Sequence, residues 1–508
     1  MIAPVRPSPR AEPWLGVLAG AAAFGVPFAF FTGLVLHQFY VKGSFLLDAG
    51  WFAYVMSVAD PRLPNPLSLG GGSFFAVHIS PIFLATALVR RGLPVSDAQF
   101  FAGFIGVCHA LPALGVYWVL RAGFRLRGGG GILTAALAAI AFAFNGLSLA
   151  IARYPHYEIL IVGSVILFAV ALVQRSLIAA AICFALALAT REDSGFHLFA
   201  ILCVLIALNR WRGLPWRDQR AEIAFAVIAL TCSLAALAVQ LTIATGPSAF
   251  MRIYLGDPPF AKFTAETILE RLLGYGTHRA YLVLPALIAA LWAIRTRNPY
   301  ILVGYVAFLP WGLLHLVAHS DIAGTLSGYY AFPFMIASCW PLVGVLLDWR
   351  RRGIEGRAAP AVLSFAAMTA ASFVALTQQY NPGQVDLATG FLVPPAPLRQ
   401  ALTERAVAEL VRSKPFLGAV AVDGSVVALA PDGFSWSETV QGRGTALPDA
   451  VVYFVQGYES ATARRIAAAS GLEVHYRVTG TAIRIAAARP IVDAAPIATL
   501  VVPADTPE

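Results

Sequence analysis

Long apolar segments are the feature that most constrains how this chain can fold. They recur through the first 380 residues, and most have about 17–25 residues, enough for a helix to cross a hydrocarbon core of about 30 Å. In lipid, a helix satisfies its own backbone polar groups. Only 12% of the residues are charged, against about 25% in a soluble domain. The chain is therefore expected to be an integral membrane protein.

About eleven of these segments are predicted to cross the membrane as helices. The first, near 14–36, is too long for the core of a signal peptide and lacks a clear small-residue cleavage site, so we expect it to be retained. The others lie near 97–120, 131–150, 157–173, 176–190, 195–209, 221–245, 279–295, 299–318, 327–347 and 359–379. Residues 1–380 are thus predicted to form an α-helical polytopic domain.

Arginines follow alternate segments and predict the orientation of the chain. They are Arg6, Arg10, Arg121, Arg125, Arg127, Arg175, Arg210, Arg212, Arg217, Arg220, Arg295, Arg297, Arg350, Arg351, Arg352 and Arg357. Positive charge favours cytoplasmic loops, so we expect a cytoplasmic N-terminus and an extracytoplasmic C-terminal part. Arg90 and Arg91 fit only if PIFLATALVRRG forms a helix on the outer membrane surface, because about twelve residues are too few to span.

Charge and cysteines exclude other classes of protein. The net charge of +9 is spread over the ends of apolar segments, not gathered in one patch, so no nucleic-acid partner is expected. All five cysteines lie inside apolar segments, which predicts packing roles and no disulfide framework.

The C-terminal part has a different composition. A linker is expected over 381–397, followed by a small soluble α/β domain over 398–508. Apolar runs at 418–422, 426–430 and 449–455 predict strands, and Thr479-Gly480 predicts the turn of a hairpin. This part contains no Gly-rich phosphate loop, nucleophile elbow or metal-ligand spacing.

Polar residues gather in the predicted external loops, where such groups are costly and usually functional. In the first loop, 37–96, Asp48 heads a short amphipathic stretch. It either caps that helix or acts as a functional acid. His78 follows a Gly-rich approach, GGGSFFAVHISP, and is either a structural hydrogen-bonding group or a substrate ligand.

Two later loops are similarly polar. In TREDSGFH, Asp193 or Ser194 is expected to cap the next helix, whereas Glu192 has no such use. An acid and a base at a helix N-terminus suit binding of a phosphate or a metal. The candidate ligands here are Arg191, Glu192, Asp193 and, one turn on, His197.

The loop RYPHYE supplies further candidates. Glu158 would complement the dipole of the next helix, which leaves Arg153 and His156 available for substrate. The weaker candidates are Asp257, His278, Arg279, Asp321, Tyr329 and Tyr330.

The order of these motifs resembles that of a known superfamily. An acid soon after the first helix, a surface helix after His-x-x-Pro and a soluble external tail resemble the GT-C membrane glycosyltransferases, which use polyprenyl-phosphate-linked sugars. More narrowly, DAGWF, HISPIF, HYE and REDSGFH are similar to an uncharacterised bacterial family of multi-pass membrane proteins related to them. The resemblance covers most of 14–380 and, more faintly, LPDAVVYFV in the tail.

The resemblance implies an activity in a bacterial inner or plasma membrane. Asp48 would be the first-loop catalytic acid, acting as general base on the acceptor or as ligand to a divalent cation (Mg or Mn). Ala49 and Gly50 stand where many members carry a second carboxylate, so a metal does not follow from the motif. Glu192 and Asp193 match the acidic motif of the narrower family, with Glu192 as a second catalytic candidate.

The expected reaction is the transfer of a hexosyl or pentosyl group, with inversion, from a polyprenyl-phosphate donor to an unknown acceptor on the extracytoplasmic face. Two alternatives stay open: a transporter or flippase of a lipid-linked or small substrate, and a catalytically silent envelope protein. A transporter would place its charges near the bilayer midplane on broken helices.

Overall fold

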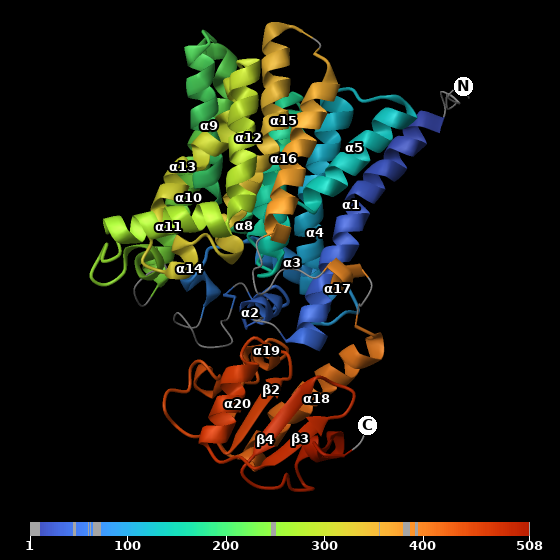
Figure 1. The fold of residues 1–508 in the computed structure, drawn as a ribbon, viewed down its shortest axis with the longest axis vertical. Coiled ribbons are helices and arrows are strands. Elements are labelled where there is room, and N and C mark those ends of the chain that lie inside the picture. The colour runs from blue at the N-terminus through green and yellow to red at the C-terminus, as the bar shows by residue number, and fades with distance from the viewer. Residues whose placement is uncertain are drawn as a thin grey trace.

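The structure is a computed structural model. It describes residues 11–43, 47–58, 60, 62–63, 73–244, 250–354, 356–378, 387–391 and 395–506. A bundle of long helices forms one part, and a smaller α/β part with a five-stranded sheet lies at one end of it (Figure 1).

A helix occupies every segment that was predicted to span the membrane. These helices are α1 (Ala11–His37), α4 (Asp97–Trp118), α5 (Gly128–Ala143) with α6 (Gly146–Ala152), α7 (Ile159–Val173), α8 (Leu177–Thr190), α9 (Ser194–Trp211), α10 (Arg220–Ile243), α12 (Ala280–Thr296), α13 (Val303–Leu316), α15 (Phe332–Arg352) and α16 (Ala358–Gln378). Within the described ranges, seven helices are long and apolar enough to cross a membrane, or up to nine if each bent pair is one span. The exact number of crossings stays a prediction.

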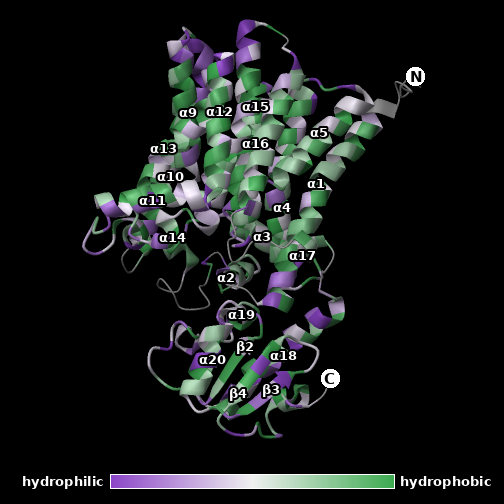
Figure 2. Ribbon diagram, viewed as in Figure 1, coloured by the Kyte–Doolittle hydropathy of each residue, from purple (hydrophilic) through white to green (hydrophobic). Residues whose placement is uncertain are grey.

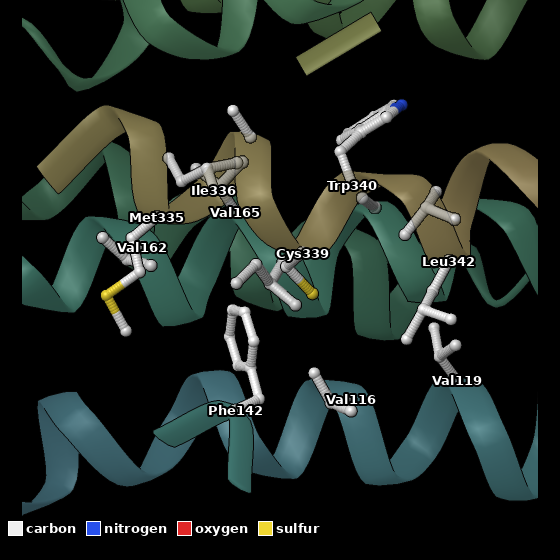
Figure 3. Close-up of a cluster of buried hydrophobic side chains, with 14 of the residues drawn as sticks. Val116, Val119, Phe142, Val162, Val165, Met335, Ile336, Cys339, Trp340 and Leu342 are labelled. Carbon is white, nitrogen blue, oxygen red and sulfur yellow. The ribbon is translucent and has the colours of Figure 1, made fainter. Parts of the chain in front are cut away.

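The core of the bundle is built where α4, α7 and α15 meet. Side chains from these helices interdigitate, with Phe142 of α5 closing one side (Figure 3). The bundle is also apolar on its outside, where Leu291, Ile294 and Leu363 are 66%, 72% and 69% exposed. Hydrophobic residues cover the helices over most of their length (Figure 2). A helix that is apolar all round is typical of a membrane span.

Several of the arginines predicted to lie on one face share one end of the bundle, whereas Arg6 and Arg10 lie outside the described residues. The guanidinium of Arg350 lies near those of Arg125 and Arg175, and Arg212 Nη1 is 3.7 Å from Asp348 Oδ1. Arg350 precedes the turn from α15 to α16, which is at the end farthest from the C-terminal sheet (Figure 1). The grouping of the loops into two ends is thus seen directly. Which end faces the cytoplasm stays a prediction.

Short helices cover the end of the bundle nearer the sheet. The first loop contains η1 (Gln38–Lys42), α2 (Leu47–Val55), η2 (Phe74–Ala76) and α3 (Ile82–Arg91). Helix α3 is the expected short helix ending at Arg91. The remaining short elements are η5 (Met251–Leu255), α11 (Ala265–His278), α14 (Asp321–Gly324), η7 (Gly328–Ala331) and α17 (Leu387–Phe391), and, beside the arginine-rich loops, η3 (Val119–Gly123), η4 (Trp216–Gln219) and η6 (Pro299–Leu302).

The C-terminal part packs helices on a sheet of order β1-β2-β4-β3-β5. Its elements are α18 (Pro397–Leu417), β1 (Val420–Val422), α19 (Gly424–Val427), η8 (Trp436–Glu438), β2 (Ala450–Phe454), α20 (Ser460–Ala469), β3 (Val474–Val478), β4 (Ile483–Ala487), η9 (Pro496–Leu500) and β5 (Val501–Pro503). The predicted hairpin is β3–β4. The strand expected over 426–430 is wrong: α19 starts there because the Asp423 side chain accepts hydrogen bonds from the backbone of Ser425 and Val426.

Candidate functional site

Three segments far apart in the sequence meet at the end of the bundle nearer the sheet. His78 comes from the first loop, Glu158 precedes α7, and Arg191 to Asp193 connect α8 to α9. The Nδ1 atom of His78 is 2.8 Å from Glu192 Oε1, and the backbone N–H of Ile79 donates to Glu192 Oε2 at 2.9 Å. Glu192 therefore fastens the first loop to the α8–α9 connection.

A buried ion-pair network surrounds Arg191. Its Nε donates to Asp193 Oδ1 at 2.7 Å, and its terminal nitrogens contact Asp193 and Glu158. Glu158, fully buried, also contacts His156, and His197 Nε2 is 3.7 Å from Asp193. Burial raises the pKa of Asp193, but the charge and hydrogen bonds of Arg191 hold it well below its usual range. Arg191 is thus shared by two carboxylates.

This network corrects one expectation about helix capping and adds a partner to a residue expected to complement a helix dipole. Asp193 occupies the N-cap position of α9, but its side chain makes no capping hydrogen bond and turns to Arg191 instead. Glu158 does stand at the N-terminus of α7, where the helix dipole favours it. Its main partner is nevertheless Arg191, 33 residues later in the chain.

Asp48 adjoins this network through the aromatic residues around it. It lies in the first turn of α2, where a carboxylate also complements the helix dipole. Its charge acts on His78 and on the hydroxyls of Tyr329 and Tyr330. Burial raises the pKa of the Asp48 carboxyl, and the nearby His78 opposes that increase. One turn on, Phe52 packs edge-on against the His156 ring at 4.4 Å.

Stacked rings lie beside both Asp48 and the ion-pair network. The rings of His156 and Tyr329 stack with centroids 3.8 Å apart, and Tyr329 stacks on Tyr330 at 4.4 Å. Such rings offer flat, half-polar surfaces beside an acid. Asp48, His78, His156 and Tyr329 therefore belong to one site, together with the Arg191 network.

Two arginines form a positively charged rim beside these rings. Arg153 ends α6, and Arg279 lies between α11 and α12. Both charges act on the hydroxyl of Tyr281. Arg279 donates to Ser327 Oγ at 2.6 Å, and Arg153 lies 5.4 Å from the Tyr154 ring centroid. Within the described ranges, neither makes an ion pair with a carboxylate.

A cavity of about 290 Å³ opens beside Arg191 and Glu192. Its walls are otherwise mostly apolar and come from α8, α10 and the first loop: Ile79, Pro81, Leu188, Ala189, Cys232, Ser233 and Ala236. Ser233 is 2% exposed, and its hydroxyl finds no hydrogen-bond partner in the described part of the chain. An apolar slot with a charged end suits an amphipathic molecule.

The sequence alone did not identify every residue of the site. Tyr157 and Ser80, both fully buried, share a hydrogen bond of 3.0 Å that ties the first loop to the segment before α7. Ser233 could have been noticed as a hydroxyl within an apolar segment. Of the weaker candidates, Tyr329, Tyr330 and Arg279 belong to the site. The other three have different surroundings: Asp321 pairs with Lys262 at 2.6 Å, His278 contacts Thr277, and Asp257 is exposed.

The ligands for a divalent cation do not come together in the described residues. No group of three or more His, Cys, Asp or Glu side chains is arranged there to hold a metal ion. Mg²⁺ and Mn²⁺ prefer several oxygen ligands. Ala49 and Gly50, which follow Asp48, offer no carboxylate, and Glu158 and Asp193 pair with Arg191. This donor set does not fit a cation held by protein side chains alone.

Comparison with known proteins finds similarity to solved structures. Neither a protein-family model nor a curated protein sequence matches the chain. In three dimensions the chain is similar to ArnT from Cupriavidus metallidurans, whose crystal structure was determined bound to undecaprenyl phosphate. The TM-score is 0.48 at 13% sequence identity, and the similarity covers 94% of this chain and 98% of ArnT.

Proposed function

We propose that the protein is a GT-C-type membrane glycosyltransferase. It would move a sugar from a polyprenyl-phosphate donor to an acceptor at the end of the bundle that faces the C-terminal part. The observation that carries the proposal is the position of Asp48, a carboxylate of raised pKa beside the stacked rings of Tyr329 and Tyr330. The motifs that resemble GT-C enzymes supply most of these residues.

Asp48 acts as the general base in this proposal. It accepts the proton of the acceptor hydroxyl while the hydroxyl oxygen forms a bond to the anomeric carbon. The bond from that carbon to the phosphate oxygen breaks on the opposite side, which inverts the anomeric configuration. A base works best when its pKa approaches the working pH, and burial moves the Asp48 carboxyl in that direction.

The phosphate of the donor is assigned to Arg153 and Arg279. Guanidinium groups suit phosphate oxygens and balance the charge that develops as the phosphate leaves. Arg191 was a further candidate for this role, but its charge is already shared by Glu158 and Asp193. Arg191 is instead assigned a structural role in the floor of the site.

Glu192 and the rings complete the assignment. Glu192, expected to be a second catalytic acid, holds His78 and the backbone of Ile79, so we assign it to positioning the first loop. Tyr329, stacked on His156, presents an aromatic edge where a sugar would pass between the arginines and Asp48.

The test is turnover by the purified protein in lipid nanodiscs with a panel of polyprenyl-phosphate sugars. Asp48→Asn keeps the shape of the side chain but cannot accept the proton, so kcat should fall about 10²–10⁴-fold. Asp60→Asn is the matched control: Asp60 lies in the same loop, and its side chain accepts a local hydrogen bond from the backbone N–H of Arg62. Equal turnover by wild type and Asp48→Asn would remove Asp48 from the mechanism, and no turnover with any donor would refute the proposed function.

A further inference from the structure

Helix α2, which carries Asp48, is held between two different cores. It has only nine residues, too few to be stable alone in water. On one side, Trp51, Phe52 and Val55 are buried in the aromatic cluster of the first loop. On the other side, Leu47 packs against the core of the C-terminal part. The position of α2 therefore depends on the C-terminal part as well as on the bundle.

The closest contact joins Gly50 to Ala428. A Cβ atom placed on Gly50 would lie 2.1 Å from Ala428 Cα and 2.4 Å from its carbonyl oxygen. The two backbones can approach this closely only because Gly50 has no side chain. Ala428, directly after α19, is 3% exposed and belongs to the aromatic cluster that also contains Phe52. The C-terminal part thus extends into the wall of the candidate site.

A second contact fixes the chain just before α2. The carbonyl oxygen of Gly43 accepts hydrogen bonds from Ser425 Oγ and, at 3.1 Å, from the backbone N–H of Tyr458. The segment that contains Ser425 is held in turn by Asp423, which is fully buried. Its carboxyl accepts from the backbone N–H groups of Ser425, Val426 and Phe454 at 3.0, 3.0 and 2.6 Å.

Helix α18 adds a third contact, away from α2. Tyr40 of η1 bonds to Glu404, and Gln99 Nε2 of α4 donates to Gln400 Oε1 at 2.8 Å. The C-terminal part is therefore attached both to the helix that carries the acid and to the bundle. A domain attached in this way sets the distance between them.

We propose that the C-terminal part is a positioning element for Asp48, with the Gly50–Ala428 contact as its main point of action. It fixes the rotation and height of α2, so that the carboxylate points to the acceptor and not to solvent. This inference rests on the proposed function, because it gives the contact a role in that reaction. Gly50 and Ser425 are positioning residues in this scheme and touch no substrate.

The test compares Gly50→Ala with a matched glycine substitution. The added methyl group forces Ala428 and α2 apart, and a displacement of about 1 Å in an active site can cost about 10²-fold in rate. We expect kcat to fall about 10²-fold, with the KM for the donor changed less than about twofold. Gly103→Ala in α4, where no atom lies within 4 Å of the added Cβ, should keep the wild-type rate. Ser425→Ala, which adds no bulk, should lower kcat a few-fold with the same unchanged KM.

A reversible cross-link tests the contact without relying on a damaging variant. The Cβ of Leu47 is 3.3 Å from a Cβ placed on Gly424, close to the spacing of about 3.5–4.5 Å in disulfides. Leu47→Cys/Gly424→Cys should therefore form a disulfide on oxidation, and each single variant should not. The oxidised double variant should turn over as fast as the reduced one, because the contact persists through the cycle.

The outcomes separate this inference from the proposed function. Wild-type turnover combined with a normal kcat in Gly50→Ala and Ser425→Ala would overturn the positioning role and leave the function standing. Failure of the cross-link to form would overturn the contact itself. Loss of turnover on oxidation, restored by reduction, would show that the C-terminal part has to leave α2. Absence of wild-type turnover with every donor would refute both.

Discussion

Arg191 is expected to contribute far more to the stability of the fold than the two arginines of the rim, Arg153 and Arg279. In Arg191→Gln, Glu158, which is fully buried, and Asp193, whose side chain is 16% exposed, lose their shared cation. Removing one partner of a buried ion pair costs about 3–5 kcal/mol, because the other charge stays buried and uncompensated. The glutamine retains one donor group, so we expect a loss near the lower limit, about 3 kcal/mol.

The assay is the free energy of unfolding, measured by steric trapping in bicelles. Arg153→Gln is the matched control, because Arg153 has no carboxylate partner among the described residues and only a ring contact at 5.4 Å, worth about 1 kcal/mol or less. That variant should stay folded but bind the donor less tightly. Adding Glu158→Gln to Arg191→Gln should recover part of the lost stability. Equal losses in the two arginine variants, or a loss below about 1 kcal/mol in Arg191→Gln, would refute the reasoning.

Two further predictions concern pH and metal ions. Asp48 has to be ionised to accept a proton, so kcat should rise with pH through a pKa above the value of about 3.9 for a free aspartate. His78→Gln removes the neighbour that lowers this pKa, so the rise of kcat with pH should occur at still higher pH in that variant. A rise of kcat at the same pH in His78→Gln as in the wild type would contradict the effect of His78 on the pKa of Asp48. EDTA should change turnover by less than about twofold, because the described side chains do not assemble a cation site; a loss restored by Mg²⁺ would show that Asp48 needs a metal.

The local parts of the structure could be predicted from the sequence because they depend on neighbouring residues. Segment length and hydropathy predict the long helices, and the short apolar stretch that ends at Arg91 predicts α3. No helix is predicted between 245 and 279, yet α11 forms there, and Leu269, Leu272 and Leu273 recur along it at helical spacing. The run at 426–430 was read as a strand because its apolar residues fit either structure, and capping by Asp423 decided the outcome.

The arrangement of the site depends on contacts that no spacing in the sequence reveals. The sequence shows that the loops RYPHYE and TREDSGFH are both polar. It does not show that Arg191 of one loop pairs with Glu158 of the other. Likewise, Gly50 was noted only as the absence of a second carboxylate, whereas its lack of a side chain admits Ala428 from the other end of the chain. In both cases a pair of residues far apart determines what each of them can do.

The distribution of charge also orders the proposed reaction in space. Arg191 with Glu158 and Asp193 carries a net charge of −1, and Glu192 lies beside it. A phosphate placed there would face like charges, each costing about 4 kcal/mol at about 4 Å and an effective dielectric constant of about 20. At Arg153 and Arg279 it would meet attraction instead. In the proposed reaction the sugar would lie between that rim and Asp48, so that its anomeric carbon would face the base while the leaving phosphate stayed on the opposite side.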